Sequence, residues 1–334
     1  MVRMKRIAVV IPYFGKLPNY FEAWLISAQN NTSIDFLIFT DDADIKKYKL
    51  AANIKVELIS FQKFRDYFQN SLNFKIFLQY PYKICDYRPM YGISLKKFLG
   101  EYDFWGFGDF DMILGDVRSY ITDAVLNSYD RIYNYGALSL IKNTSEMNTL
   151  FKQKNNYKDC LSYNYVYRTN FSLYFDEMGG HRYGYGQSVV AMRDKKIKIL
   201  LNKDCADVKP SRFSFELFVS NERYDYFEYV NGSLWGIRNN KRIRTFVYLH
   251  FQKRKMQIDE NLDPSHFYIG PDRISSSKND IKDSCHDDDA KKNFYKNRYK
   301  QVGKNIISLF KQGAIKFILN SQLKRININN GTKM

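Results

Sequence analysis

Two aspartates separated by a single phenylalanine are the residues best suited to chemistry in this sequence. Asp109 and Asp111 follow an apolar run within the stretch DFWGFGDFDMILGD, which begins at Asp103. Carboxylates this close repel each other unless a cation lies between them, and hard oxygen ligands suit Mg²⁺ or Mn²⁺, which in turn bind diphosphates. At a strand end, one aspartate can bind the metal while the other binds a ribose hydroxyl. The alternative is a solvated turn that carries two acids.

A histidine far along the chain can complete such a site. His250 lies in the stretch YLHFQKRKM, after a strand-like run and before Lys253 and Lys255. Imidazole can join carboxylates around a metal, and lysines two or more residues on can neutralise a leaving diphosphate. The alternative is a lone histidine at a strand edge beside a solvated basic turn.

A second acidic pair lies in the glycine-rich stretch FDEMGGHRYGYGQS. Asp176 and Glu177 are candidates for a base that accepts a proton from a hydroxyl group. Glycines in this stretch permit tight turns and a close approach of the backbone. The alternative is a glycine-rich surface loop with incidental acids.

The first 60 residues predict the elements that position these side chains. The stretches KRIAVVIPYFG, IDFLIFTDD and NIKVELISF are typical of buried strands, and NYFEAWLISAQNN has helical spacing after a possible N-cap at Asn19. A strand, a helix and a strand in this order predict a parallel sheet, so the fold class we expect is α/β. Ligands bind beyond the carboxyl ends of such strands, where Phe14-Gly15 and Asp41-Asp42 would lie.

The rest of the chain predicts one large domain and an extension. Residues 82–99 predict a helix after Pro89, and residues 223–256 predict a β-rich return with an Asn231-Gly232 hairpin turn. We expect residues 1–260 to form the catalytic domain, residues 261–290 a polar loop, and residues 291–334 a basic amphipathic helix.

The positive charge of the chain is concentrated at its C-terminal end. The 334 residues carry a formal net charge of +17, and residues 291–334 hold eleven Lys or Arg and no acid, which leaves +6 on the first 290. Such a segment suits a polyanionic surface such as anionic lipid, or it packs on its own domain. No apolar run is long enough to span a membrane, and the four scattered cysteines predict a reduced, cytosolic protein.

The order of these stretches resembles bacterial polysaccharide-biosynthesis glycosyltransferases of the GT-A fold, which occur in capsule and O-antigen clusters. The blocks that carry the resemblance are IAVVIPYFG, FLIFTDD, PYKICDYRPMYG, YDFWGFGDFDMILGD, FDEMGG and YLHFQKRKM. The resemblance implies a mainly parallel sheet flanked by helices, a UDP-sugar donor and a divalent metal, Mn²⁺ or Mg²⁺. It implies a saccharide acceptor, which we expect to be lipid-linked and to lie at the cytoplasmic face of the inner membrane.

The same resemblance implies roles for individual residues. Asp109 and Asp111 match the DxD motif of the family, and His250 matches a C-terminal histidine that often joins the metal. The residues expected at the nucleobase, at the ribose or near the donor are Pro12, Tyr13, Phe14, Asp41, Asp42, Lys83, Asp86 and Arg88. Lys253 and Lys255 would contact the diphosphate, and the stereochemistry of transfer stays open.

Two other classes of function compete with this interpretation. A nucleic-acid-binding protein would explain the charge and the 27 tyrosines, but the charge lies in the tail and no nucleic-acid motif is present. A phosphatase of the haloacid dehalogenase family would use DFDMI, with Asp109 as the nucleophile. In that family the nucleophile follows the first strand of the fold, whereas at least three predicted strands precede Asp109.

Overall fold

The computed structural model describes residues 3–134, 136–153, 159–180, 184–252 and 254–311. The chain divides into two compact units, and each is assembled from three separate stretches. Unit 1 comprises residues 1–64, 97–143 and 198–297, and unit 2 comprises residues 65–96, 144–197 and 298–334. The units interleave along the sequence and do not follow the expected division at residue 260.

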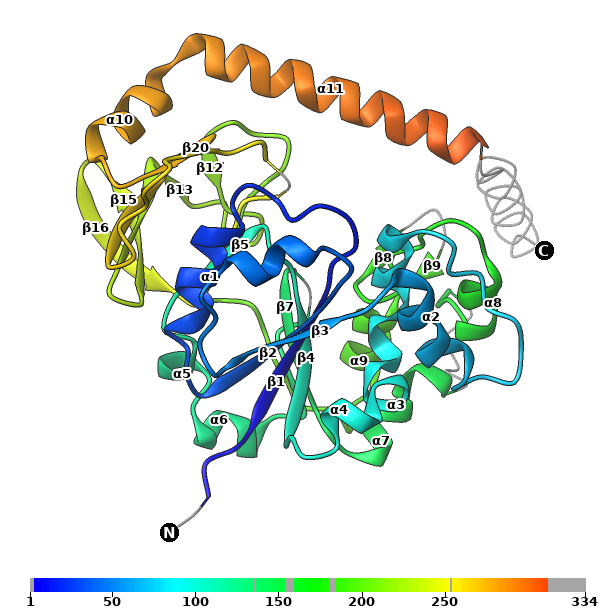
Figure 1. Ribbon diagram of the computed structural model, residues 1–334. Coiled ribbons are helices and arrows are strands. Elements are labelled where there is room, and N and C mark those ends of the chain that lie inside the picture. The colour runs from blue at the N-terminus through cyan, green and yellow to red at the C-terminus, as the bar shows by residue number, and fades with distance from the viewer. Residues whose placement is uncertain (1–2, 135, 154–158, 181–183, 253, 312–334) are drawn as a thin grey trace, which may run out of the picture. The chain divides into compact units, whose positions relative to one another are not determined.

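Unit 1 is built on a seven-stranded sheet in the order β10-β6-β7-β4-β1-β2-β3. Figure 1 labels β7, β4, β1, β2 and β3 of this sheet. Strands β3, β2, β1 and β4 are parallel to one another, and β7 is antiparallel to both β4 and β6. The strands are β1 Ile7–Pro12, β2 Ile34–Thr40, β3 Ile54–Leu58, β4 Phe104–Gly108, β6 Arg131–Ile132, β7 Leu138–Lys142 and β10 Ile199–Leu200. The expected α/β class with a mainly parallel sheet flanked by helices is confirmed.

Helix α1, Phe21–Gln29, packs its apolar side on this sheet. Trp24 is fully buried and shares one core with Val9 of β1 and Phe36 of β2. Burial of each large apolar side chain stabilises the fold by roughly 1.5–3 kcal/mol. Asn19 does not cap the helix as expected, because its side chain donates to the carbonyl of Met256 at 2.7 Å instead. The other helical elements near this sheet are η1 Ala43–Lys47, α5 Val117–Tyr120 and α6 Asp123–Ser128.

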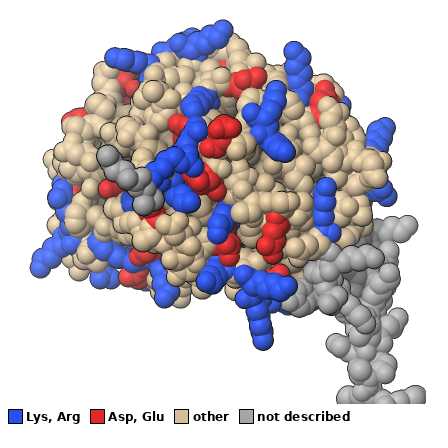
Figure 2. Space-filling model, turned by 90° about the horizontal axis from the view of Figure 1, so that it is seen from below, with Lys and Arg blue, Asp and Glu red and all other residues tan. Residues whose placement is uncertain are grey.

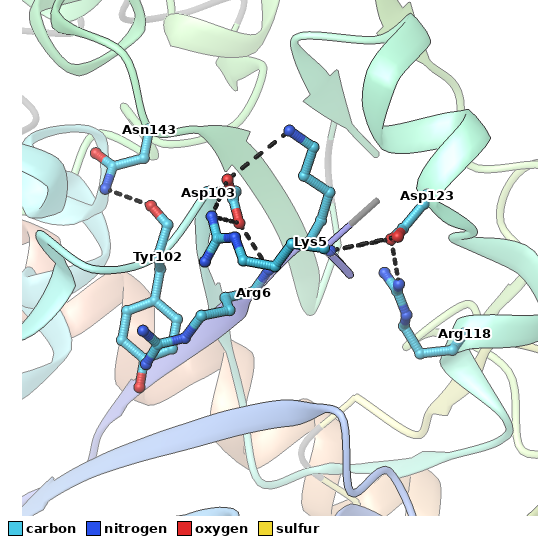
Figure 3. A network of polar contacts seen from close by, with 8 residues as sticks. Lys5, Arg6, Tyr102, Asp103, Arg118, Asp123 and Asn143 are labelled. Carbon is cyan, nitrogen blue, oxygen red and sulfur yellow. Dashed lines mark hydrogen bonds and ion pairs between the residues drawn. The ribbon is translucent and has the colours of Figure 1, made fainter. Parts of the chain in front are cut away.

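Charged residues join β1 and β4 at their amino ends (Figure 3). The carboxylate of Asp103 accepts hydrogen bonds from the Arg3 guanidinium at 3.0 Å and from the backbone N–H of Arg6 at 2.8 Å. The backbone N–H of Lys5 lies 3.3 Å from the Asp123 carboxylate, which also pairs with Arg118. Figure 2 shows a face on which such basic and acidic side chains are interspersed, in contrast to the acid-free sequence of residues 291–334.

A three-stranded sheet, in the order β11-β17-β5, carries Asp207 at the end of β11 and His250 at the end of β17. Its strands are β5 Met112–Leu114, β11 Cys205–Asp207 and β17 Tyr248–His250. Strand β17 is antiparallel to β5 and parallel to β11. All nine residues are buried, so the sheet is a rigid support for the side chains at its end.

The remaining strands of unit 1 form a six-stranded sheet and a two-stranded ribbon. They are β14 Tyr226–Val230, β15 Ser233–Arg238, β16 Lys241–Phe246, β18 Gln257–Ile258, β19 His266–Ile269 and β20 Arg273–Ser275, with β12 Phe215–Glu216 and β13 Arg223–Tyr224 in the ribbon. The hairpin turn at Asn231-Gly232 is confirmed, with φ angles of 45° and 85°.

Residues 261–290 are not the polar loop that the sequence predicts. They contain β19, β20 and helix α10, Lys278–His286. Phe267, Ile269 and Ile281 are fully buried, and these few apolar residues are enough to fold the segment onto the six-stranded sheet. The sequence shows no clear apolar periodicity here, because two short strands and one short helix have few apolar residues each and polar residues surround them.

Unit 2 is mostly helical and has an aromatic core. Tyr87 and Tyr167 stack with ring centroids 4.4 Å apart, and Phe68 packs edge-on against Tyr87. Its elements are α2 Phe61–Gln69, η2 Pro81–Met90, α3 Tyr91–Ser94, α4 Lys96–Leu99, α7 Ser145–Thr149, η3 Leu150–Lys152, α8 Tyr163–Arg168, β8 Gly179–Gly180, β9 Gly184–Tyr185 and α9 Gln187–Arg193. Two of these elements, α2 and α4, extend across the boundary with unit 1.

Helix α11, Asp288–Lys311, is the described part of the basic C-terminal segment. Phe294 packs against Phe213 with ring centroids 5.6 Å apart, whereas Tyr299, Val302 and Ile307 are exposed. Residues 312–334, which carry the rest of the expected extension, lie outside the described residues. Among the residues described, no helix has the length and apolar character needed to cross a membrane.

Gly106 in the middle of β4 is required by the close approach of β7. A Cβ atom at this position would lie 2.1 Å from the carbonyl oxygen of Ser139. We expect Gly106→Ala to lower the free energy of unfolding by about 1–3 kcal/mol, because the strand pair must separate to make room. Thermal unfolding measures the loss.

Gly303 provides the control for this prediction. A Cβ atom there would meet no atom within 4 Å, so Gly303→Ala is expected to leave stability unchanged or raise it by up to about 1 kcal/mol. Equal melting temperatures for Gly106→Ala and the unaltered protein would contradict the packing of β4 on β7.

Candidate metal and nucleotide site

Asp109 and Asp111 flank a phenylalanine that is anchored in the core. Phe110 is 2% exposed and packs against the rings of Tyr13, Phe21 and Trp24, with centroids 5.2, 5.0 and 4.7 Å away. The three residues form the short connection between β4 and β5, at the carboxyl end of β4. The buried ring therefore holds the connection in place and presents the two carboxylates where an α/β sheet binds ligands.

His250 is brought next to Asp111 by the pairing of β17 with β5. His250 lies opposite Met112 in the register, and the N–H of Phe251 donates to the carbonyl of Asp111 at 3.0 Å. The imidazole Nε2 atom lies 3.4 Å from Oδ1 of Asp111, and the two residues are 8% and 6% exposed. The structure thus brings together two of the three predicted metal ligands across 139 residues of sequence, and Asp109 lies two residues from one of them.

Asp207 is a third residue of this site, next to His250, and it was not predicted from the sequence. It lies opposite His250 in the pairing of β11 with β17, and its Oδ1 atom is 2.9 Å from Nδ1 of His250. Burial lowers the pKa of His250, but the two carboxylates outweigh burial and raise this pKa well above its usual value. Asp207 lies in the stretch CADVKP without a motif around it, so only the strand pairing reveals it.

Two tyrosines are affected by the charges of the same acidic residues. Burial and the charge of Asp111 raise the pKa of Tyr13, and burial, Asp111 and Asp109 contribute to raising the pKa of Tyr20. Both side chains therefore stay protonated and can donate hydrogen bonds at neutral pH. Tyr13 was predicted as part of a nucleotide site, and Tyr20 was not.

The loop after β1 is held by the two aspartates at the end of β2. Asp41 accepts a hydrogen bond from the N–H of Gly15 at 2.7 Å, and Asp42 accepts one from the N–H of Leu17 at 2.7 Å. Gly15 adopts a φ of 100°, which suits a glycine in this turn. Hydrogen bonds from Leu17 and Asp44 lower the pKa of Asp42, so it stays ionised.

These contacts give Asp41 and Asp42 a structural role, and their expected place at a ribose stays a prediction. Each aspartate uses a carboxylate oxygen to fix the loop that continues from Pro12 and Tyr13. Phe14 in this loop packs against Phe61 and Phe64, with ring centroids 5.3 and 5.4 Å away. The aspartates therefore shape the loop that is predicted to line the nucleobase.

Lys83 and Asp86 are internal residues of unit 2 that bind each other, and their expected place near the donor stays a prediction. Both side chains are 0% exposed and form an ion pair of 2.7 Å. Lys83 also donates to the carbonyls of Val166 and Phe171, and Asp86 accepts from the backbone N–H groups of Leu173 and Phe175. The pair ties η2 to the segment after α8, because buried charges must satisfy their hydrogen bonds internally.

Arg88 and Asp176 form a second buried ion pair in unit 2. Their side chains are 3.0 Å apart, with 7% and 3% exposed. Burial raises the pKa of Asp176 even though Arg88 opposes the shift, and Glu177 and Asp86 add to it. A carboxylate enclosed in an ion pair is poorly placed as a base for an acceptor hydroxyl, so this contact gives the predicted role of Asp176 no support. Glu177 is half-buried beside it.

The basic residues after His250 differ in their exposure to solvent. Lys255 is exposed, and Lys253 lies outside the described residues. Arg254 between them is buried, donates to the carbonyls of Phe213, Arg212 and Pro271, and has a pKa that burial lowers to about 9. Arg254 therefore anchors the segment, which leaves Lys255 on the surface.

The side chains of Asp111 and His250 fit a metal ion whose remaining ligands come from a substrate. Over the residues that the structure describes, no three His, Cys, Asp or Glu side chains gather as a metal site. Asp111 and His250 would provide two ligands, and Mg²⁺ or Mn²⁺ is often held by one or two carboxylates plus substrate phosphates and water. Two atoms that bind one ion at about 2.1 Å lie about 3–3.5 Å apart, and the 3.4 Å separation agrees with this.

Comparison with solved structures gives partial matches at low identity. The chain is similar to the glycosyltransferase GlyE of Streptococcus pneumoniae TIGR4, with 12% identity, coverage of 60% of this chain and 46% of that chain, and a TM-score of 0.27. It is similar to the galactosyltransferase LgtC, solved with donor and acceptor sugar analogs, with 12% identity, coverage of 73% and 86%, and a TM-score of 0.36. The chain therefore spans less than half of GlyE.

Sequence comparison adds one match. No curated protein matches the sequence. Residues 9–278 match the model of a family described as a family of unknown function (DUF6625). The matched residues include Asp109, Asp111, Asp207 and His250.

Proposed function

Because the chain belongs to DUF6625, a family of unknown function, we propose its function from its own site: a metal-dependent glycosyltransferase. The donor we propose is a nucleotide sugar, in the first place a UDP-sugar, and the acceptor is a saccharide. The observation that carries the proposal is the approach of His250 Nε2 to within 3.4 Å of Asp111 Oδ1 at the end of a buried sheet. The resemblance of the DxD and LHFQKRKM stretches to glycosyltransferases supports it.

Each residue of the site has a part in this reaction. Asp111 and His250 would hold Mn²⁺ or Mg²⁺, and Asp109 would bind the metal or the ribose. When bound, the cation supplies positive charge that stabilises the leaving nucleoside diphosphate. Lys255 would add positive charge from the surface, and Tyr13 would donate a hydrogen bond to the nucleotide while its loop lines the nucleobase. Asp176 is enclosed in its pair with Arg88, so Glu177 remains the candidate base for the acceptor hydroxyl.

The phosphatase alternative has less support. Asp109 follows β4, the fourth strand of the chain, which lies inside the sheet between β1 and β7. A phosphatase nucleophile of the haloacid dehalogenase type follows the first strand, and β1 ends instead at Pro12-Tyr13. The alternative predicts a covalent phosphate on Asp109, which mass spectrometry of the protein after incubation with a phosphomonoester would detect.

A panel of nucleotide sugars tests the proposed function. With Mn²⁺ present, the purified protein is expected to hydrolyse or transfer from at least one UDP-sugar, and addition of EDTA is expected to stop the reaction. Release of the nucleoside diphosphate is the measured quantity. Neither binding nor turnover with any UDP-, GDP-, CMP- or dTDP-sugar would refute the proposal.

We also propose that residues 291–334 attach the protein to the cytoplasmic face of an anionic membrane, where a lipid-linked acceptor would lie. The segment has eleven Lys or Arg and no acid, and each basic residue near an anionic surface contributes about 1 kcal/mol. In the full chain, replacing Lys311, Lys316, Lys324, Arg325 and Lys333 by glutamine is expected to weaken co-sedimentation with phosphatidylserine vesicles at least a hundredfold. Unchanged vesicle binding would contradict this attachment.

A further inference from the structure

We propose that Asp207 is a positioning residue that orients the imidazole of His250 so that Nε2 faces Asp111. This inference rests on the proposed function and extends it to a residue 43 positions before His250 in the sequence. Asp207 has no sequence motif around it, and its place next to His250 comes from the pairing of two buried strands.

The contact between Asp207 and His250 is short and shielded from water. Oδ1 of Asp207 lies 2.9 Å from Nδ1 of His250, and both residues are 8% exposed. The two ring nitrogens point in different directions, so a hydrogen bond from Nδ1–H to Asp207 leaves Nε2 as the atom that faces Asp111, 3.4 Å away. A carboxylate that accepts from one nitrogen of a ligating histidine fixes both the tautomer and the ring orientation.

Gln252 fixes the carboxylate of Asp207 in turn. Its side-chain amide donates to the same Oδ1 atom of Asp207 at 2.6 Å. Gln252 has a φ of 57°, in the left-handed region, which costs a non-glycine residue roughly 1–2 kcal/mol. The chain thus turns sharply after β17 in a conformation that places the Gln252 amide on Asp207.

Asp207 is not placed to bind the same ion as Asp111. Its contact is to Nδ1, and the contact of Asp111 is to Nε2, so the imidazole ring lies between the two carboxylates. The geometry therefore gives the two aspartates different roles. Asp111 provides a metal ligand, and Asp207 orients the imidazole ring of His250.

Titration with Mn²⁺ in the presence of UDP tests this role. Replacing a residue that orients a metal ligand typically weakens metal binding 10- to 100-fold, and we expect this loss in calorimetry for Asp207→Ala. Asp207→Asn is expected to lose less, because its amide oxygen still accepts the hydrogen bond from Nδ1. The control is Asp204→Asn, which removes a half-exposed acid just before β11 and should bind Mn²⁺ within about twofold of the unaltered protein.

A double-variant cycle separates positioning from a merely structural role. In a His250→Ala background, Asp207→Ala is expected to cause no further loss of Mn²⁺ affinity, because the residue it positions is gone. Equal losses in both backgrounds would overturn the proposal, as would unaltered Mn²⁺ affinity of Asp207→Ala alone. If Asp207→Ala does not fold, Asp207→Asn takes its place in the cycle with the same expected outcome.

The result also distinguishes this proposal from the proposed function. If the unaltered protein binds neither Mn²⁺ nor UDP, the glycosyltransferase proposal fails. If it binds both and the Asp207 variants bind as well as it does, only the positioning role fails.

Discussion

Asp111→Asn is expected to lower metal-dependent turnover about 10³-fold. The change keeps the size of the side chain and removes its negative charge, so a hard cation loses its carboxylate ligand beside His250. The loss corresponds to several kcal/mol of charge stabilisation on the leaving diphosphate. The measurement is the rate of nucleoside diphosphate release from a UDP-sugar over a range of Mn²⁺ concentrations.

Asp116→Asn is the matched control for this variant. Asp116 is an exposed acid five residues further on, and its side chain caps helix α5 by accepting from the N–H of Ser119. Asparagine caps helices as well as aspartate does, so neither stability nor turnover is expected to change. Full turnover by Asp111→Asn, or equal losses in both variants, would show that Asp111 does not hold the metal.

Lys83→Met is expected to lower the free energy of unfolding by about 3–5 kcal/mol, because it leaves the buried charge of Asp86 without its partner. The structure places this pair inside unit 2, where Lys83 donates to backbone carbonyls and Asp86 accepts from backbone N–H groups. Molecules of the variant that remain folded should therefore bind UDP and Mn²⁺ with unaltered affinity. Guanidinium denaturation measures the first quantity, and calorimetry measures the second.

Lys75→Met is the control for the stability loss. Lys75 is an exposed lysine of unit 2, and its replacement is expected to change the free energy of unfolding by less than about 0.5 kcal/mol. If Lys83→Met is as stable as Lys75→Met and loses its affinity for UDP instead, Lys83 contacts the donor and the internal role derived from the structure is wrong.

Local patterns were sufficient for the first half of the sheet. The run IAVVIP has five consecutive buried residues from Ile7 to Ile11, and Phe21 and Trp24 lie on the buried side of α1 as their spacing predicts. The approach of Asp109-Asp111 to the carboxyl end of β4 followed from the apolar run before them. These features depend on residues that are neighbours in sequence, so one sequence reveals them.

The contacts of the polar site residues could not be predicted in the same way. A lysine, an aspartate and an arginine near a proline look like ligand-binding residues, but Lys83 and Asp86 satisfy each other inside unit 2. Arg88 likewise pairs with Asp176, 88 residues away. A single sequence shows which groups carry charge and does not show which charges are paired in the folded chain.

Strand pairing explains the remaining differences. Asp207 reaches His250 only because β11 pairs with β17, and the sequence around Asp207 carries no signal of its own. The short strands β19 and β20 lie in a stretch that polar residues dominate, and they belong to a sheet in which only β14, β15 and β16 fall in the predicted β-rich stretch. Tertiary contacts decide such elements where local propensity is weak.

The proposed function requires that Asp111 and His250 form a metal site that binds a nucleoside diphosphate. Titration of UDP into the protein by calorimetry, with and without Mn²⁺, tests it most directly. The account predicts tight binding with Mn²⁺, at least about a hundredfold weaker binding with EDTA, and loss of the Mn²⁺ effect in both Asp111→Asn and His250→Ala. UDP affinity that is the same with Mn²⁺ and with EDTA would contradict it.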